Sequence, residues 1–162
     1  MTNSSVSDVD TADLAIVGAG AAGLATAIFA ARARPGLRVR CFDGARHIGA
    51  KILVSGGSRC NVTNRDVGDR DFWGGPSPIV RRVLRAFPSP RAVEFFAALG
   101  VALHEEEDGK LFPDSNRSRT VLDALLAEAA RLGVVLSPGM RVTDVRPAAR
   151  GALTVETVAG RC

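Results

Sequence analysis

The sequence predicts an α/β fold whose core is a doubly wound parallel sheet. Three observations support this prediction. A β-prone stretch, residues 14–17, leads into a glycine-rich turn and then into a run of good helix formers. A second short strand, residues 38–42, ends at an acidic residue. An amphipathic segment, residues 118–132, stops at a glycine before a third apolar strand at residues 134–136, so strands alternate with helices along the chain.

The glycine-rich turn organises the chain. Residues 14–31 carry no charge over a length that also suits a membrane span. However, Gly18 and Gly20 fall where a strand ends and where the chain needs positive φ or a close backbone approach. Gly23 and Ala27 are four residues apart on one face of the predicted helix, residues 22–33, where small side chains let the helix lie against the strand. We therefore predict a strand, a tight turn and a helix.

This arrangement suits the diphosphate group of a dinucleotide in a Rossmann-like fold. The first amide groups of a helix have no partner within the helix and, together with its dipole, they attract anions. Asp43 follows Gly23 by twenty residues, the spacing at which an acid accepts the ribose hydroxyls. An acid there also disfavours a 2′-phosphate, and therefore NADP. The alternative is ordinary βαβ packing without a ligand. The predicted diphosphate-binding residues are Gly18, Ala19, Gly20, Ala21, Ala22 and Gly23.

Composition limits the other function classes. The 162 residues are 46% hydrophobic and 23% charged, as in a globular domain with its own core. The net charge of +4 is spread along the chain without a basic block, so we expect no nucleic-acid partner. Residues 1–12 are acidic and lack the positive charge of a secretory signal, which predicts a disordered lead, a cytoplasmic location and no membrane association.

Cysteines and histidines give no sign of a metal site. The three cysteines are odd in number and form no C-x-x-C pair, which fits a reducing compartment. His47 and His104 have no neighbours at the spacing of metal ligands. We predict no bound metal.

A second informative stretch is the polar segment that follows Lys51. Gly56 and Gly57 are flanked by Ser55, Arg59 and further polar residues up to Asn64. This density of donors suits a flat ligand rich in heteroatoms, although glycine, serine and asparagine also form ordinary surface turns. Residues 44–51 come near a P-loop, but the lysine does not follow the second glycine directly, so we reject a nucleoside triphosphatase.

The remaining segments predict a loop, two helices, a turn and a hairpin. Residues 65–78 predict a loop, and residues 79–87 an amphipathic helix with arginines on its polar face. A second helix is predicted at residues 91–99, with Ser89 as its cap. Residues 106–109 predict an acidic turn between two strands, and residues 141–146 and 152–158 predict a hairpin.

The strings GAGAAG, SGGSRCNVTN and KLFPDS, in this order, resemble the N-terminal part of the HI0933-like (YhiN/BaiN-like) family of FAD-dependent oxidoreductases, from Asp13 to the C-terminus. The resemblance implies FAD as a tightly held cofactor, with Asp43 at the adenosine ribose and the backbone of Val142 at the adenine. Ser58 and Ala50 depart from the family pattern, which usually has a glycine and a basic residue there. The residues implied to approach the flavin are Lys51, Ser55, Gly56, Gly57, Arg59, Cys60 and Asn61.

The resemblance also implies a domain organisation. Residues 13–66 and 118–162 form an FAD-binding domain, and residues 67–117 form an inserted helical and hairpin segment on the substrate side. The family continues beyond Cys162 with a further parallel strand and most of its substrate domain. We therefore expect a fragment of a longer flavoprotein or a truncated product.

The expected activity is oxidoreduction of a small-molecule substrate by hydride transfer through flavin N5, with NAD(P)H as a candidate electron donor. Arg59 or Lys51 is predicted to stabilise negative charge on the reduced ring. The sequence indicates neither a catalytic residue nor an oligomeric state. A nicotinamide-dependent dehydrogenase and a truncated, non-catalytic remnant remain as alternatives.

Overall fold

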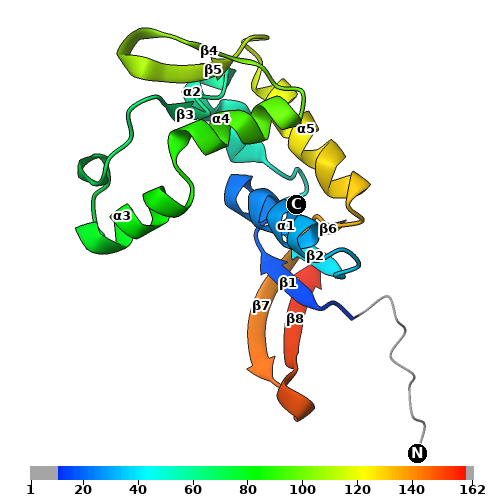
Figure 1. The fold of residues 1–162 in the computed structure, drawn as a ribbon. Helices are drawn as coiled ribbons and strands as arrows, with labels where there is room; N and C mark the ends of the chain where they lie inside the picture. The colour runs from blue at the N-terminus through cyan, green and yellow to red at the C-terminus, as the bar shows by residue number, and fades with distance from the viewer. Residues whose placement is uncertain (1–10, 160–162) are drawn as a thin grey trace, which may run out of the picture. The chain divides into compact units, whose positions relative to one another are not determined.

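The computed structural model describes residues 11–159 (Figure 1). Nearly all of the predicted disordered lead, residues 1–12, lies outside this range. The chain forms two compact units: unit 1 contains the residues up to Gly49 and from Leu126 onward, and unit 2 is Ala50–Leu125. The predicted insertion, residues 67–117, lies within unit 2, which also includes residues 50–66 and 118–125 of the predicted FAD-binding domain. Each unit is described by itself.

Unit 1 contains a parallel sheet with the strand order β1-β2-β6 (Figure 1). The strands are β1 (Leu14–Val17), β2 (Val39–Phe42) and β6 (Val135–Ser137). In the sheet, Leu14 pairs with Val39 and Arg40 pairs with Val135. The predicted α/β fold with a parallel sheet is confirmed, and the third strand begins one residue later than predicted.

Helix α1 (Ala21–Ala33) packs on β1 and β2. Leu24 and Ile28 on one face of this helix are fully buried, as is Cys41 on the central strand, whereas Phe29 on another face is 41% exposed. Burial raises the pKa of the Cys41 thiol to about 11, so this cysteine is protonated and unreactive at neutral pH. The uncharged run, residues 14–31, is divided between β1, a turn and α1, and no helix within residues 11–159 has the length and apolar character to cross a bilayer.

A hairpin follows the sheet. Strands β7 (Met140–Pro147) and β8 (Leu153–Ala159) pair antiparallel around a short turn, Ala149–Gly151, in which Arg150 has a φ of 58°. The predicted hairpin is confirmed. β7 begins close to the end of β2, because the amide of Gly139 donates to the carbonyl of Ala45 at 2.9 Å.

Glu128 in unit 1 is buried, at 8% exposure, between two arginines. It accepts from Arg131 at 2.7 Å and from Arg32 at 2.7 Å. Hydrogen bonds from Arg131 first, and then from Arg32, lower the pKa of the Glu128 carboxyl from 4.5 to about 2. Because its pKa is lower in the folded state, the ionised carboxylate stabilises unit 1 above about pH 4.5, and this stabilisation is lost as pH falls toward 2.

We therefore expect Glu128→Gln to remove part of the acid sensitivity of folding. The wild-type chain should lose on the order of 2 kcal/mol more unfolding free energy than the variant between pH 5 and pH 2. Urea unfolding followed by circular dichroism across this range measures the difference. Parallel pH profiles for the two proteins would show that Glu128 does not carry the effect.

Unit 2 contains an antiparallel sheet with the order β3-β5-β4 and is otherwise mostly helical. Its strands pair residue 63 with 111 and residue 104 with 112. The acidic turn predicted at residues 106–109 is confirmed. The elements are α2 (Ala50–Ser58), β3 (Thr63–Asn64), α3 (Ser77–Ala86), α4 (Ser89–Ala98), β4 (Leu103–Glu105) and β5 (Lys110–Pro113), with short 3-10 turns at Asp69–Asp71 and Glu107–Gly109. Helix α5 (Ser118–Arg131) begins in unit 2, and its residues from Leu126 onward belong to unit 1.

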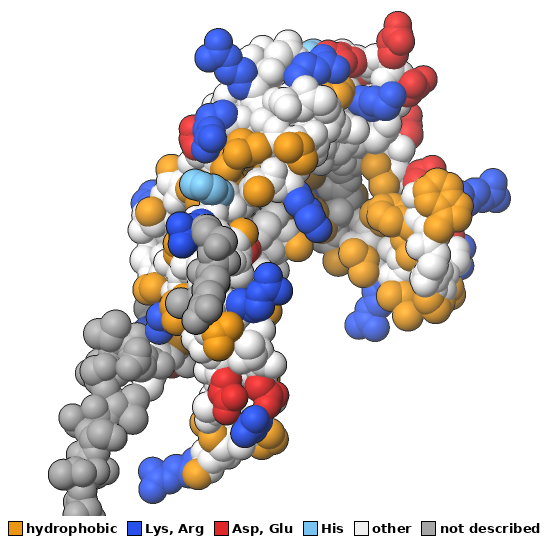
Figure 2. Space-filling view, turned by 180° about the vertical axis from the view of Figure 1, so that it is seen from behind, with side chains coloured by type: hydrophobic (Ala, Val, Ile, Leu, Met, Phe, Trp, Pro, Cys, Tyr) orange, Lys and Arg blue, Asp and Glu red, His pale blue; other side chains and the backbone are white. Residues whose placement is uncertain are grey.

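The two helices predicted between residues 79 and 99 are present as α3 and α4. The prediction that Ser89 caps α4 is wrong by one residue: Pro88 occupies the cap position, and the Ser89 hydroxyl donates to the carbonyl of Asn64. Helix α3 has no buried residue, and its apolar residues Ile79 and Val83 are more than half exposed. Hydrophobic side chains gather on the surface of this part of unit 2 (Figure 2, right).

Candidate functional site

The three glycines of the turn after β1 have three different roles. Gly18 adopts a φ of +94°, which favours glycine. Gly23 lies so close to the strand that a Cβ there would be 1.8 Å from the carbonyl oxygen of Gly18. A Cβ on Gly20 would meet no atom within 4 Å. Gly18 and Gly23 are therefore required by the fold itself, whereas Gly20 keeps the space in front of the helix open.

Among residues 11–159, no side chain caps the N-terminus of α1. Gly20 is the cap residue and has no side chain to bond the first amides, and the first turn contains no acidic residue. The first helical hydrogen bond runs from Leu24 N–H to Gly20 O at 2.9 Å, so the preceding amides have no acceptor within the helix. Free amides and the positive end of the helix dipole together favour an anionic group such as a diphosphate.

Asp43 is bonded directly to the glycine turn. Its Oδ2 accepts from the amide of Ala19 at 2.7 Å, and its Oδ1 accepts from the amide of Ala45 at 2.8 Å. The carboxylate thus joins the end of β2 to the turn after β1. Each carboxylate oxygen has two acceptor sites, so both oxygens keep the capacity to accept a ligand hydroxyl.

An open cleft of about 460 Å³ lies at this edge of unit 1. Three of the predicted site residues line it, although they come from separate parts of the chain: Gly18, Asp43 and Val142. The structure therefore brings the predicted diphosphate, ribose and adenine residues to one place. The lining residues are Val17, Gly18, Phe42, Asp43, Gly44, Ala45, Arg141 and Val142.

The residues predicted at the flavin half all lie in unit 2, around an unusual turn. Helical backbone angles end before Ser55, and Gly56 and Gly57 then adopt left-handed angles, with φ of 53° and 65°. A Cβ on Gly56 would lie 2.6 Å from the amide nitrogen of Asn61 and 2.9 Å from the Phe112 ring. Gly56 therefore permits both the backbone conformation and the close contact with Phe112.

The other predicted residues of this turn differ in exposure. Cys60 is buried, at 7% exposure, and has a φ of 66°. Lys51, in the first turn of α2, and Asn61 are exposed, and Ser55 is half-buried, with its hydroxyl donating to Ile52 O at 2.8 Å. The helical start of this segment was not predicted, because a short apolar run such as KILV is typical of a helix and a strand alike.

Ser58, one of the two departures from the resembled pattern, also has a left-handed φ of 67°. A side chain in this conformation costs about 1–2 kcal/mol, part of which glycine loses again through its greater freedom in the unfolded chain. We expect Ser58→Gly to raise the free energy of unfolding by about 1 kcal/mol, measured by urea unfolding. Ser58→Ala keeps the strained backbone and is the matched control. A gain in the alanine variant equal to that in the glycine variant would contradict the explanation.

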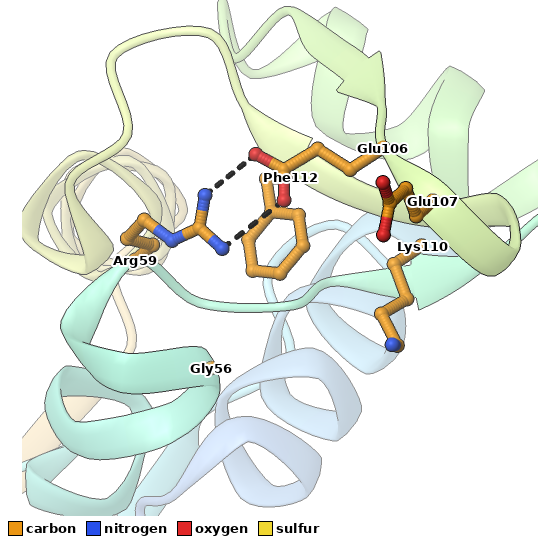
Figure 3. A pocket seen from close by; sticks show the side chains of 6 residues that line it. All are labelled: Gly56, Arg59, Glu106, Glu107, Lys110 and Phe112. Atoms are coloured by element: carbon orange, nitrogen blue, oxygen red, sulfur yellow. Dashed lines mark hydrogen bonds and ion pairs between the residues drawn. The ribbon is translucent and has the colours of Figure 1, made fainter.

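Arg59 is held on two sides (Figure 3). Its guanidinium forms a bidentate ion pair with Glu106, at 2.5 and 3.1 Å, and lies 4.2 Å from the centre of the Phe112 ring. Hydrogen bonds from Arg59 first, and then from His104, lower the pKa of Glu106. Glu106 therefore compensates the positive charge of Arg59. That Arg59 or Lys51 stabilises a reduced ring stays a prediction.

The ion pair borders a pocket of about 540 Å³ in unit 2 (Figure 3). Sequence reasoning missed the part played by Glu106, which it assigned to a plain turn. Arg59 and Glu106 are 47 residues apart, and no local pattern signals such a pairing. The pocket is lined by Gly56, Arg59, Glu106, Glu107, Lys110 and Phe112. Within residues 11–159, no group of three histidine, cysteine or acidic side chains is placed to hold a metal ion.

Comparison with known proteins identifies the family. Residues 12–161 match the family described as "HI0933-like protein Rossmann domain". The chain belongs to this family. The resemblance found in the sequence is thereby confirmed, and the match extends over both units.

Two relatives of the HI0933-like chain have assigned activities. It is 34% identical over 138 residues to a 3-dehydro-bile acid delta(4,6)-reductase from Clostridium scindens, covering 85% of this chain and 34% of that protein. It is 34% identical over 130 residues to a ribosomal RNA dihydrouridine synthase from Haemophilus influenzae, covering 80% of this chain and 32% of that protein. The chain spans about a third of the length of the curated relatives it matches.

Solved structures share the fold. A mutant of Escherichia coli quinol fumarate reductase matches with a TM-score of 0.61 and 21% identity, over 85% of this chain and 27% of that one. A 3-ketosteroid-delta4-(5alpha)-dehydrogenase from Rhodococcus jostii matches with a TM-score of 0.56 and 18% identity, over 91% of this chain and 42% of that one. At these identities the likeness supports the Rossmann-like fold alone.

Proposed function

We propose that this chain is the FAD-binding part of a flavin-dependent oxidoreductase. The observation that carries the proposal is the bond from Ala19 N–H to the Asp43 carboxylate, which joins the glycine turn to the acidic strand end beside an open cleft. The residues present fit the cofactor: α1 offers uncompensated amides, and the space at Gly20 is open. Membership of the HI0933-like family supports FAD as the dinucleotide.

Each part of unit 1 has a role toward the cofactor. The amides at the start of α1 bind the diphosphate, Asp43 accepts the ribose hydroxyls, and the backbone of Val142 meets the adenine. FAD supplies the hydride chemistry when bound, and the protein supplies position and electrostatics. In unit 2, Gly56 and Arg59 line a separate pocket, and the proposal that they approach the flavin rests on the family resemblance.

The relatives' names favour a reductive reaction. One is a delta(4,6)-reductase, and the other makes dihydrouridine, so both names describe the addition of hydrogen to a substrate. We propose that the protein reduces a carbon–carbon double bond of its substrate, with NAD(P)H as the electron donor, in the cytoplasm. The substrate itself differs between the two relatives, and we assign none to this chain.

The test is cofactor binding by the purified 162-residue chain. After incubation with FAD and gel filtration, flavin absorbance should elute with the protein, and titration should quench the flavin fluorescence. FMN, which lacks the adenosine half, should bind more weakly, and NAD⁺ should not displace FAD. A chain that binds NAD⁺ in preference to FAD, or that retains no FAD, would overturn the proposal.

A further inference from the structure

Arg141 is a cation at the wall of the cleft in unit 1 that the fold does not use. It lines the cleft and is exposed. Among residues 11–159, its guanidinium forms neither an ion pair nor a hydrogen bond with the protein. Arg40 differs, because it donates to Ser137 Oγ at 3.0 Å and lies 4.9 Å from the centre of the Phe42 ring. Arg141 therefore remains available to a ligand.

The backbone fixes where Arg141 stands. The amide of Asp43 donates to Ser137 O at 3.1 Å, and the amide of Gly139 donates to Ala45 O at 2.9 Å. These two bonds align the segment after β2 with the segment before β7. They bring Arg141 beside Gly44, the residue that follows the ribose-binding acid.

Gly44 lets the arginine lie close to the backbone. A Cβ built on Gly44 would be 3.3 Å from Arg141 Cβ, 3.4 Å from its Nε and 3.5 Å from its Cζ. The first distance is slightly tighter than an ordinary contact and the other two are ordinary contacts, so the Arg141 side chain lies against the backbone of Gly44. The pair thus places a flat cation next to Asp43 at the nucleoside end of the cleft.

The chemistry of this wall suits an aromatic base. A guanidinium is planar and stacks on aromatic rings through cation–π attraction. The cleft also contains apolar side chains, Val17, Phe42 and Val142, which can contact the base. A base between these groups and Arg141 would keep its ribose within reach of the Asp43 carboxylate.

We propose that Arg141 determines specificity for the adenine half of the cofactor by stacking its guanidinium on the adenine ring, beside the backbone of Gly44. This inference rests on the proposed FAD site and names a residue of that site. It predicts that Arg141 acts on any adenine nucleotide or nucleoside that enters the cleft and has no effect on FMN, which lacks the adenosine half.

Calorimetric titration of the full chain with adenosine, ADP, FAD and FMN tests the proposal. Arg141→Ala should lower the affinities for adenosine, ADP and FAD by a similar factor, about tenfold. The affinity for FMN should not change. Arg141→Lys keeps the positive charge but lacks the planar guanidinium, so it should lose most of the affinity that Arg141 adds for the adenine ligands.

Arg146→Ala is the matched control, since Arg146 lies on the same strand but pairs with Asp144 and Glu156. It should bind all four ligands as the wild-type chain does, and circular dichroism should show every variant folded. Weakened ADP binding with unchanged adenosine binding would mean a phosphate contact and would overturn stacking. Unchanged ADP and FAD affinities in Arg141→Ala would also overturn the proposal.

The proposed FAD site and the role of Arg141 fail in different ways. A wild-type chain that binds ADP but not FAD contradicts the FAD proposal, while the ADP and adenosine titrations still decide on Arg141. Equal FAD affinities of the wild-type chain and Arg141→Ala contradict only the stacking role. A wild-type chain that binds no adenine ligand overturns both.

Discussion

Gly23→Ala is expected to lower the free energy of unfolding by about 3 kcal/mol and to abolish FAD binding. The added methyl carbon would lie 1.8 Å from the oxygen and 2.9 Å from the carbon of the Gly18 carbonyl. Because the obstacle is backbone, no rotation of a side chain relieves the contact, and α1 must move away from β1. Urea unfolding followed by far-ultraviolet circular dichroism measures the loss of stability.

Gly20→Ala is the matched control for Gly23→Ala. A Cβ there meets no protein atom within 4 Å, and the residue has an extended conformation with a φ of −77°. We expect stability to change by no more than about 0.5 kcal/mol, while FAD affinity falls because the methyl group occupies the space in front of the α1 amides. If Gly23→Ala unfolds at the same urea concentration as Gly20→Ala, the close packing of α1 on β1 is not what requires a glycine.

The fold of unit 1 could be predicted from the sequence because its signals are local. β1, the glycine turn and α1 follow one another within twenty residues, and apolar periodicity marks each boundary to within one residue. Asp43 was predicted from its spacing alone, and the structure does bring it to the glycine turn. Its contacts with two backbone amides, at Ala19 and Ala45, depend on a tertiary arrangement that spacing does not contain.

Unit 2 was less predictable because its site depends on long-range contacts. The motif around Gly56 marked a special turn, but it does not show that Gly56 lies close to the ring of Phe112, more than fifty residues later in the chain. The pairing of Arg59 with Glu106 could not be predicted either, because the two residues are 47 positions apart in the sequence. The acidic turn that holds Glu106 looks like any solvated loop until β5 places it beside Arg59.

Helix α3 illustrates a further limit. Periodicity correctly placed Ile79 and Val83 on one face, and the arginines on another. It could not tell whether another part of the protein covers the apolar face, because amphipathicity describes the helix alone. In the described residues this face is exposed.

Asp43→Ala is expected to lower the free energy of unfolding by about 3 kcal/mol and to remove most of the affinity for FAD. Two backbone amides, those of Ala19 and Ala45, would lose a charged acceptor, and Ala19 is completely buried, so water cannot replace its bond without rearrangement. The loss of stability should therefore appear without any ligand. Urea unfolding of the ligand-free chain measures it, and fluorescence titration measures the affinity.

Asp43→Asn separates the two roles of this side chain. An asparagine has one acceptor oxygen, so it can satisfy the amide of Ala19 or that of Ala45, but not both. We expect about half of the stability loss seen with alanine, whereas FAD should bind much more weakly than to the wild-type chain because the acceptor for the ribose hydroxyls is reduced as well. FMN has no adenosine ribose, so its affinity should not change in the folded Asn variant. If FAD and FMN weaken by the same factor, Asp43 supports only the glycine turn and does not contact the ribose.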